Sequence, residues 1–296
     1  MQAPDRRRLS RQLSALADAT VAQILSASVG GCGICPVIGV AGAPGAGKST
    51  LIGKLAGIRA ATLAPLAIIA IDPSSPVSGG AILGDRVRML DLADDPRIYI
   101  RSLATRTSHD GLADNLAAML DCVASAGFAE IVTETTGVGQ VDYAIRWLVD
   151  TMVLVSTPGA GDQIQAMKSG IAELPDIFVI NKADQPGADQ MVREIETVIA
   201  HRRRGQSEWV PPVLKTSADL PDSIAALSRA IDRHRGAVTP LEREQRMLQR
   251  QRQRLSSLIA RRASAVLGQM SGPELQLPIA ELYGRVAAAL ASTEVR

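Results

Sequence analysis

Residues 37–56 read VIGVAGAPGAGKSTLIGKLA, and the rest of the chain is best interpreted from this stretch. The apolar run Val37–Ala41 predicts a buried strand that ends at the first glycine of the pattern G-x-x-x-x-G-K-S. A helical pattern, Lys48–Ala56, follows directly. Glycines in such a loop let successive backbone N–H groups converge on phosphate oxygens, and the next helix presents its positive end to them. The stretch therefore predicts a phosphate-binding loop.

Every position of this loop is a candidate nucleotide contact. Lys48 is expected to reach the β- and γ-phosphates, and the Ser49 hydroxyl is expected to bind Mg²⁺. The candidates for phosphate binding are Gly42, Ala43, Pro44, Gly45, Ala46, Gly47, Lys48 and Ser49.

Outward from the loop, short apolar runs alternate with longer amphipathic stretches. This alternation predicts an α/β fold, a mostly parallel sheet flanked by helices on both faces. Further strands are predicted at Leu66–Ile71, Ile98–Ile100, Ile131–Thr133, Met152–Ser156, Ile177–Asn181 and Val213–Thr216. Further helices are predicted at Ala113–Ala126, Gln163–Glu173, Ala188–His201 and Ile224–His234.

Helical segments are predicted on both sides of the nucleotide-binding domain, which we place at residues 36–236. Residues 1–35 carry an N-terminal helix. Residues 237–296 carry a C-terminal helical arm, broken at Pro273 before a last helix near Ile279–Leu290. In the arm, leucines recur at intervals of seven and are separated by arginines; these are Leu241, Leu248 and Leu255, with Arg243, Arg246, Arg250, Arg252, Arg254, Arg261 and Arg262.

Composition excludes several classes of protein. The chain has 296 residues with 46% apolar and 21% charged residues, which excludes disorder along the whole chain. Aromatic residues are only 2%, and Lys and Arg number 32 against 30 Asp and Glu, so no nucleic-acid partner is expected. No apolar run is long enough to cross a bilayer. Three cysteines and no signal-peptide pattern predict a cytoplasmic protein with no membrane partner.

A second motif, Asn181-Lys182-Ala183-Asp184, follows a predicted strand and indicates guanine recognition. The Asp184 carboxylate can accept from guanine N1–H and from the 2-amino group, whereas adenine offers neither donor there. Asn181 is expected to brace the loop and contact the base edge, and Lys182 to lie along the ring. After the next strand, Ser217 and Ala218 suit a backbone loop over guanine O6; a helix cap is the alternative interpretation.

Acidic residues at predicted strand ends form a third candidate group. Glu134 ends one strand, and Gly137 follows three residues later, a pattern that suits a Mg²⁺ water shell and an N–H that senses the γ-phosphate. Asp72 is expected to face the same pocket, because ligands of α/β proteins collect at the carboxyl ends of strands. Asp85 is a candidate metal ligand or switch residue; a structural cap or turn is the alternative for either Asp.

Six segments of the chain, in their order, resemble the MeaB/ArgK/MMAA family. They are GAPGAGKST, IDPSSPVSGGAILGDRVRM, IRSLATR, ETTGVGQ, PGAGDQIQAMKSGI and NKAD. The resemblance covers residues 37–235. Members are P-loop GTPases of the SIMIBI class that chaperone adenosylcobalamin-dependent acyl-CoA mutases. The resemblance implies GTP and GDP as ligands, Mg²⁺ as cofactor, a homodimer held by the arm, and a mutase, with an adenosyltransferase as a further partner.

The resemblance also implies roles for particular residues. Thr50 would join Lys48 and Ser49 at the phosphates and Mg²⁺, and Asp85 and Glu134 match the metal-associated acids. Asp72 matches the position proposed to polarise the attacking water. Gln165 and Lys168 lie in a segment similar to a third switch loop and would approach the phosphates once a partner docks.

Departures from the family pattern at Thr136, Val141, Asp142 and residues 108–111 leave the mutase open: methylmalonyl-CoA mutase, or one acting on a hydroxyacyl- or branched acyl-CoA.

The sequence leaves three rival functions open. A nickel-insertion GTPase is suggested by Cys32 and Cys35, although two cysteines supply half a tetrahedral site. A P-loop small-molecule kinase is disfavoured by the guanine motif. A binding module that uses the basic arm on nucleic acid or membrane is less usual than a solvated face or a dimer-forming arm.

Overall fold

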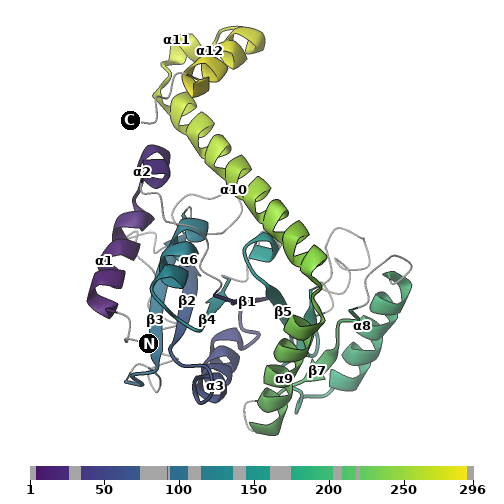
Figure 1. Ribbon diagram of the computed structural model, residues 1–296. Coiled ribbons are helices and arrows are strands. Elements are labelled where there is room, and N and C mark those ends of the chain that lie inside the picture. The colour runs from purple at the N-terminus through teal and green to yellow at the C-terminus, as the bar shows by residue number, and fades with distance from the viewer. Residues whose placement is uncertain are drawn as a thin grey trace.

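Seven parallel strands form one sheet at the centre of the protein (Figure 1). The computed structural model describes residues 5–26, 35–73, 92, 94–105, 115–135, 145–160, 175–202, 209–217 and 221–291. The strand order is β3-β2-β4-β1-β5-β6-β7, and every neighbouring pair is parallel, as the sequence predicted. The strands are β1 Val37–Gly42, β2 Leu66–Pro73, β3 Ile98–Thr105, β4 Glu130–Glu134, β5 Thr151–Ser156, β6 Ile177–Ile180 and β7 Val213–Lys215.

All seven predicted strands are present. Strands β1 to β5 are longer than predicted, by one to five residues, and β6 and β7 are each one residue shorter. Strands β1, β5 and β6 are buried at every position, because helices cover both faces of the sheet. Strands β2 and β3 continue past their apolar runs, and their pairing extends to Pro73 opposite Thr105. In both strands the apolar pattern ends before the backbone hydrogen bonds do, and for this reason the predicted strands stop short of the observed ones.

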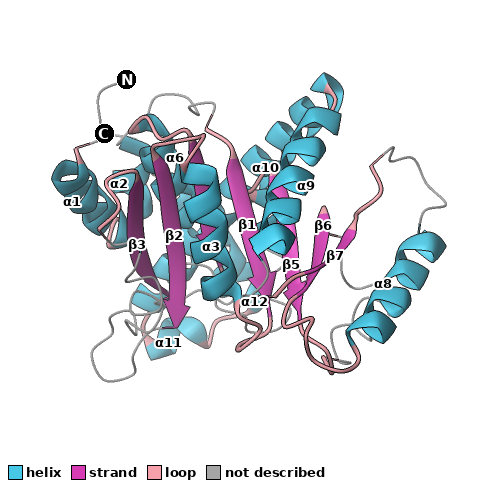
Figure 2. Cartoon of the chain, turned by 90° about the horizontal axis from the view of Figure 1, so that it is seen from below, coloured by secondary structure: helices cyan, strands magenta, loops and turns pink. Residues whose placement is uncertain are grey.

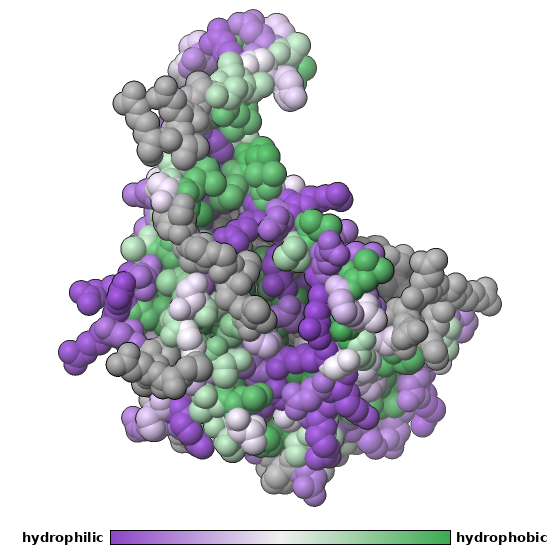
Figure 3. Space-filling model, in the orientation of Figure 1, coloured by the Kyte–Doolittle hydropathy of each residue, from purple (hydrophilic) through white to green (hydrophobic). Residues whose placement is uncertain are grey.

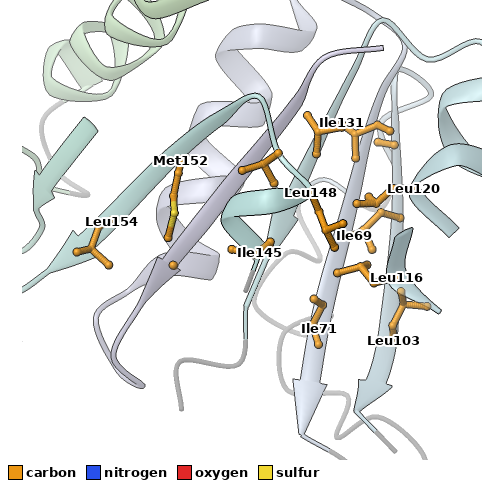
Figure 4. Close-up of a cluster of buried hydrophobic side chains, with 14 of the residues drawn as sticks. Ile69, Ile71, Leu103, Leu116, Leu120, Ile131, Ile145, Leu148, Met152 and Leu154 are labelled. Carbon is orange, nitrogen blue, oxygen red and sulfur yellow. The ribbon is translucent and has the colours of Figure 1, made fainter. Parts of the chain in front are cut away.

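Helices pack on both faces of the sheet and enclose two aliphatic cores (Figure 2). One face is covered by α1 Arg6–Ala17, α6 Leu116–Ser125 and α8 Ala188–Arg202, and the other by α3 Lys48–Ala60 and α9 Pro221–Ala237. Figure 4 shows part of the first core, where Ile69, Ile131 and Leu120 pack between the sheet and α6.

The N-terminal segment forms two helices rather than the single predicted one. Helix α1 ends at Ala17, and α2 spans Val21–Ser26. The Thr20 hydroxyl accepts from Gln23 N at 3.3 Å, and Gln23 Oε1 accepts from Thr20 N at 2.8 Å. This reciprocal capping starts a new helix at Val21, although the apolar periodicity of the sequence continues from α1 into α2.

The C-terminal arm leaves the sheet domain as one long helix (Figure 1). Helix α10 Pro240–Gln269 has 30 residues, and it begins with a capping box of Thr239 and Glu242. At 1.5 Å per residue it is about 45 Å long. Two shorter helices follow, α11 Gly272–Leu275 and α12 Ile279–Ala291, and α12 packs back against α10. The last helix is present as predicted, but the long helix ends at Gln269, and Pro273 lies in the first turn of α11 rather than at the break. None of the described helices combines the length and apolar character needed to span a bilayer.

Candidate nucleotide-binding site

The phosphate loop connects the end of β1 to the start of α3, in a backbone shape that requires glycine. A Cβ on Gly42 would lie 2.1 Å from Val155 O on the neighbouring strand. Gly47 has φ of 83°, and its Cβ would lie 2.5 Å from Asn181 Nδ2. Side chains at these two positions would push the loop away from β5 and from the guanine motif. Gly45, at φ 76°, is also in the left-handed region.

Lys48 lies across this loop rather than pointing into solvent. Its ammonium donates to Gly42 O at 2.8 Å and to Ala43 O at 3.2 Å, and the residue is buried. The loop N–H groups and the N-terminus of α3 supply partial positive charge at the same place. A cationic, N–H-lined loop of this kind is suited to an anionic phosphate chain. Thr50, the next residue of the helix after Ser49, is exposed.

Ser49 and Glu134 meet directly beneath the loop. The Ser49 hydroxyl donates to Glu134 Oε1 at 2.9 Å, and both residues are buried. Strand β4 pairs with β1, with Glu134 opposite Val40, so the carboxylate reaches the first turn of α3. A hydroxyl and a carboxylate are the oxygen ligands that Mg²⁺ prefers, and the pair therefore fits this ion.

The guanine motif is tied to the phosphate loop through the side chain of Asn181. Asn181 Nδ2 donates to Ala46 O at 2.8 Å, and Asn181 Oδ1 accepts from the Thr216 hydroxyl at 3.0 Å. Lys182, with φ of 55°, donates from Nζ to Gly45 O at 3.0 Å. Asp184 is exposed, as a carboxylate that receives a base must be. One buried amide thus joins the loops after β1, β6 and β7.

The loop after β7 lies beside the guanine motif. Ala183 N donates to Thr216 O at 3.0 Å, and Ser217 is buried. The Thr216 hydroxyl is bonded to Asn181, so Thr216 contributes to the contact between the two loops. Ser223 Oγ accepts from Ser217 N at 3.3 Å.

Several predicted site residues lie outside the described part of the chain. The backbone of Asp72 is described at the end of β2, opposite Ala104, at the same sheet edge as the loops above. Its side chain is not described, and neither are Asp85, Gly137, Gln165, Lys168 and Ala218, nor the predicted helix Gln163–Glu173.

The one described cysteine of the candidate metal pair does not favour metal binding. Burial, with the charges of Glu130 and Asp150, raises the pKa of Cys35 to about 12. Metals bind the thiolate, and this thiol stays protonated at neutral pH. Cys32 lies outside the described residues, and within those residues no three His, Cys, Asp or Glu side chains are grouped to hold a metal ion.

A set of charged contacts that was not predicted from the sequence holds α10 against the domain. Arg246 donates to Asp150 O at 2.7 Å, Arg250 pairs with Asp150 at 2.9 Å, and Arg254 pairs with Asp121 at 2.5 Å. The four-residue spacing of these arginines was a signal for one helical stripe. Leu241, Leu248 and Leu255 lie elsewhere on the helix and are exposed.

The central strand of the parallel sheet ends in the phosphate loop, and an Asn-Lys-x-Asp motif is hydrogen-bonded to that loop. These features define a P-loop protein with the elements of guanine-nucleotide binding. The chain belongs to the family described as methylmalonyl Co-A mutase-associated GTPase MeaB, whose model matches residues 10–271.

Comparison with individual proteins agrees with the family. The chain is 42% identical over 235 residues to a Pyrococcus abyssi protein named as a GTPase, which covers 78% of this chain and 71% of that one. It is 34% identical over 232 residues to GTPase ArgK of Escherichia coli, covering 77% of this chain and 70% of ArgK. The alignment with a Pyrococcus horikoshii relative covers only 63% of that protein.

A solved structure shares the fold. It is the crystal structure of a LAO/AO transport system kinase, with a TM-score of 0.64 and 22% identity over 97% of this chain and 94% of that one.

Proposed function

We propose that this protein is a GTP-hydrolysing metallochaperone that gates the loading of adenosylcobalamin into an acyl-CoA mutase and protects or reactivates that mutase. The family match over residues 10–271, to mutase-associated GTPases, is the observation that carries the proposal. The geometry supports its GTPase part, because Asn181 bonds the guanine motif to the phosphate loop. The partner is methylmalonyl-CoA mutase or a related hydroxyacyl- or branched acyl-CoA mutase.

In this proposal the chain's own residues divide the work of binding and hydrolysis. Lys48 moves from the loop carbonyls to the β- and γ-phosphates, and Asp184 accepts from the guanine edge. Ser49 and Glu134 would hold Mg²⁺, and the ion would neutralise phosphate charge. Asp72 polarises the attacking water, and Gln165 and Lys168 reach the phosphates when the mutase positions them.

The C-terminal arm supports a homodimer in the same proposal. Its arginines contact the domain, whereas Leu241, Leu248 and Leu255 are more than half exposed. Residues spaced by seven lie on one side of a helix and match the seam of a helix pair. Figure 3 shows apolar surface on the middle of the arm, between hydrophilic stretches. Because several arginines are bonded to the domain, the arm is less suited to nucleic acid than to a second copy of the chain.

The deciding experiment measures phosphate release from GTP with and without a candidate mutase at saturating GTP. We expect slow release by the free protein and faster release with the cognate mutase, because the partner supplies the missing positioning. A Lys48→Ala variant in the same mixtures controls for hydrolysis by contaminants. Equal rates with a mutase that demonstrably binds the protein would remove the gating mechanism.

A further inference from the structure

A buried ion pair lies at the far end of the phosphate-loop helix. Arg59, in the last turn of α3, is 1% exposed, and Glu130, the first residue of β4, is fully buried. Arg59 Nε and Nη2 donate to the two Glu130 carboxylate oxygens at 2.5 Å and 2.7 Å. This is the bidentate geometry that arginine alone provides, and it fixes orientation as well as distance.

The same helix and strand are joined again at their other ends, where Ser49 donates to Glu134. Ser49 and Arg59 are ten positions apart in α3, about 15 Å along the helix axis. Glu130 and Glu134 are four positions apart in β4, about 13 Å along the strand. The two spans nearly match, and the long Arg59 side chain covers the difference. Helix α3 cannot slide along β4 without breaking both contacts.

Helix α9 completes the anchor. Arg59 also donates to Asp232 Oδ1 and to the Ser228 hydroxyl, both at 2.9 Å. Arg235 of α9 forms a second ion pair with Glu130. Glu130 therefore lies between two guanidinium groups, and Arg59 lies between two carboxylates. A buried pair that is this fully satisfied is rigid, and removing one member leaves an uncompensated charge.

We propose that Arg59 is a positioning residue for the divalent-cation site: by fixing α3 against β4, it keeps the Ser49 hydroxyl and the Glu134 carboxylate close enough to share one ion. This inference rests on the proposed function, which places Mg²⁺ at that pair. Arg59 itself lies at the opposite edge of the sheet and touches neither nucleotide nor metal. Its effect is on the geometry of the metal ligands.

The test compares Arg59→Met and Arg59→Lys with wild type in the full chain loaded with GDP. Binding of Mn²⁺, a paramagnetic stand-in for Mg²⁺, is titrated by electron paramagnetic resonance, and thermal unfolding is followed in parallel. Loss of groups that orient metal ligands weakens metal binding about 10- to 100-fold, and we expect a loss in this range for Arg59→Met. Lysine keeps the charge but not the two parallel bonds, so Arg59→Lys is expected to lose about 3- to 10-fold.

Arg146→Met is the matched control. Arg146 pairs with the buried Asp176 at 2.8 Å and 3.0 Å, and this pair joins neither α3 nor β4. Arg146→Met is expected to lower the unfolding temperature but to keep Mn²⁺ affinity within about twofold of wild type. The Arg146–Asp176 pair shares no partner with Ser49 or Glu134, so the two sites should act independently.

The possible outcomes separate this inference from the function beneath it. A folded Arg59→Met variant with wild-type Mn²⁺ affinity overturns the inference alone. If Arg59→Met does not fold, unchanged affinity in Arg59→Lys does the same. Wild-type protein that binds Mn²⁺ no better with GDP than without it overturns the metal site of the proposed function, and this inference with it.

Discussion

The bond between Asn181 and Thr216 allows a quantitative test of how the guanine motif supports the phosphate loop. Asn181→Ala removes two hydrogen bonds of 2.8 Å and 3.0 Å and leaves Ala46 O and the Thr216 hydroxyl without this partner. Thr216→Val keeps the shape of the side chain and removes only the donor to Asn181 Oδ1. Both variants therefore lose the bond between Thr216 and Asn181, and only Asn181→Ala also loses the bond to Ala46 O.

The expected magnitudes follow from burial. Thr216 is fully buried and Asn181 nearly so. A buried polar group left without a partner costs about 1–3 kcal/mol, so we expect Asn181→Ala to lower the free energy of unfolding by about 2–5 kcal/mol and Thr216→Val by about 1–3 kcal/mol. The double variant is expected to cost about 1–2 kcal/mol less than the sum, because it does not leave the Thr216 hydroxyl unpaired.

Urea unfolding gives the four free energies of this cycle, and a fluorescent GDP analogue gives the affinities of the same proteins. Only Asn181→Ala frees a carbonyl of the phosphate loop, and we expect it to weaken GDP binding about tenfold more than Thr216→Val, equivalent to about 1.4 kcal/mol. Thr197→Val is the control, because the Thr197 hydroxyl bonds Arg193 O on the exposed face of α8. Additive unfolding energies, or equal effects of the two variants on GDP binding, would refute the reasoning.

Three further predictions concern the base, the arm and acid stability. Asp184→Asn is expected to weaken GTP binding by at least tenfold and to improve binding of xanthosine triphosphate, because one acceptor becomes a donor; competition binding measures both, and normal GTP affinity would contradict the base assignment. Leu248→Asp is expected to give monomers in light scattering, whereas Gln249→Asp, exposed on the same helix but turned away from the leucine seam, is not; dimers in both would contradict the arm interface. Burial raises the pKa of Asp176, but the bond from His234 and the charges of Arg146 and Arg246 outweigh it, so that pKa lies below its ordinary value. Asp176 therefore stabilises the fold above its unfolded pKa of about 3.9, and the cost of Asp176→Asn in unfolding experiments is expected to shrink as pH falls below that value; a cost independent of pH would contradict this.

Most of the sheet could be predicted from the sequence, because each strand is an apolar run bounded by polar or glycine-rich segments. The run Ile177–Ile180, for example, is buried at all four positions. The extensions of β2 and β3 could not be predicted in this way, since residues such as Pro73 and Thr105 pair through the backbone without contributing to the core. Periodicity also continued across the break between α1 and α2, where the capping of Thr20 and Gln23 is the local signal.

The nucleotide loops were predictable because their chemistry restricts residue types. Glycine is required at Gly42 by the close approach of the Val155 backbone, and at Gly47 by its positive φ and the nearby Asn181 side chain. These requirements appear in the sequence as a motif. The orientation of α10 was not predictable. Both its arginines and its leucines are spaced for one side of a helix, and only the positions of Asp121 and Asp150 on other elements determine which side faces the domain.

The contacts at the two edges of the sheet differ in kind, and this difference explains why the nucleotide loops were predictable and the orientation of α10 was not. At the carboxyl edge, the loops after β1, β6 and β7 are joined by neutral hydrogen bonds through Asn181 and by the exposed Lys182 ammonium, which donates to Gly45 O. At the amino edge, carboxylates open or precede the strands and bind arginines of α3, α9 and α10, as Glu130, Asp150 and Asp176 do. Buried ion pairs are costly to break, whereas single neutral bonds cost less. Nucleotide-dependent movement is therefore expected at the carboxyl edge, with the amino edge as its fixed base.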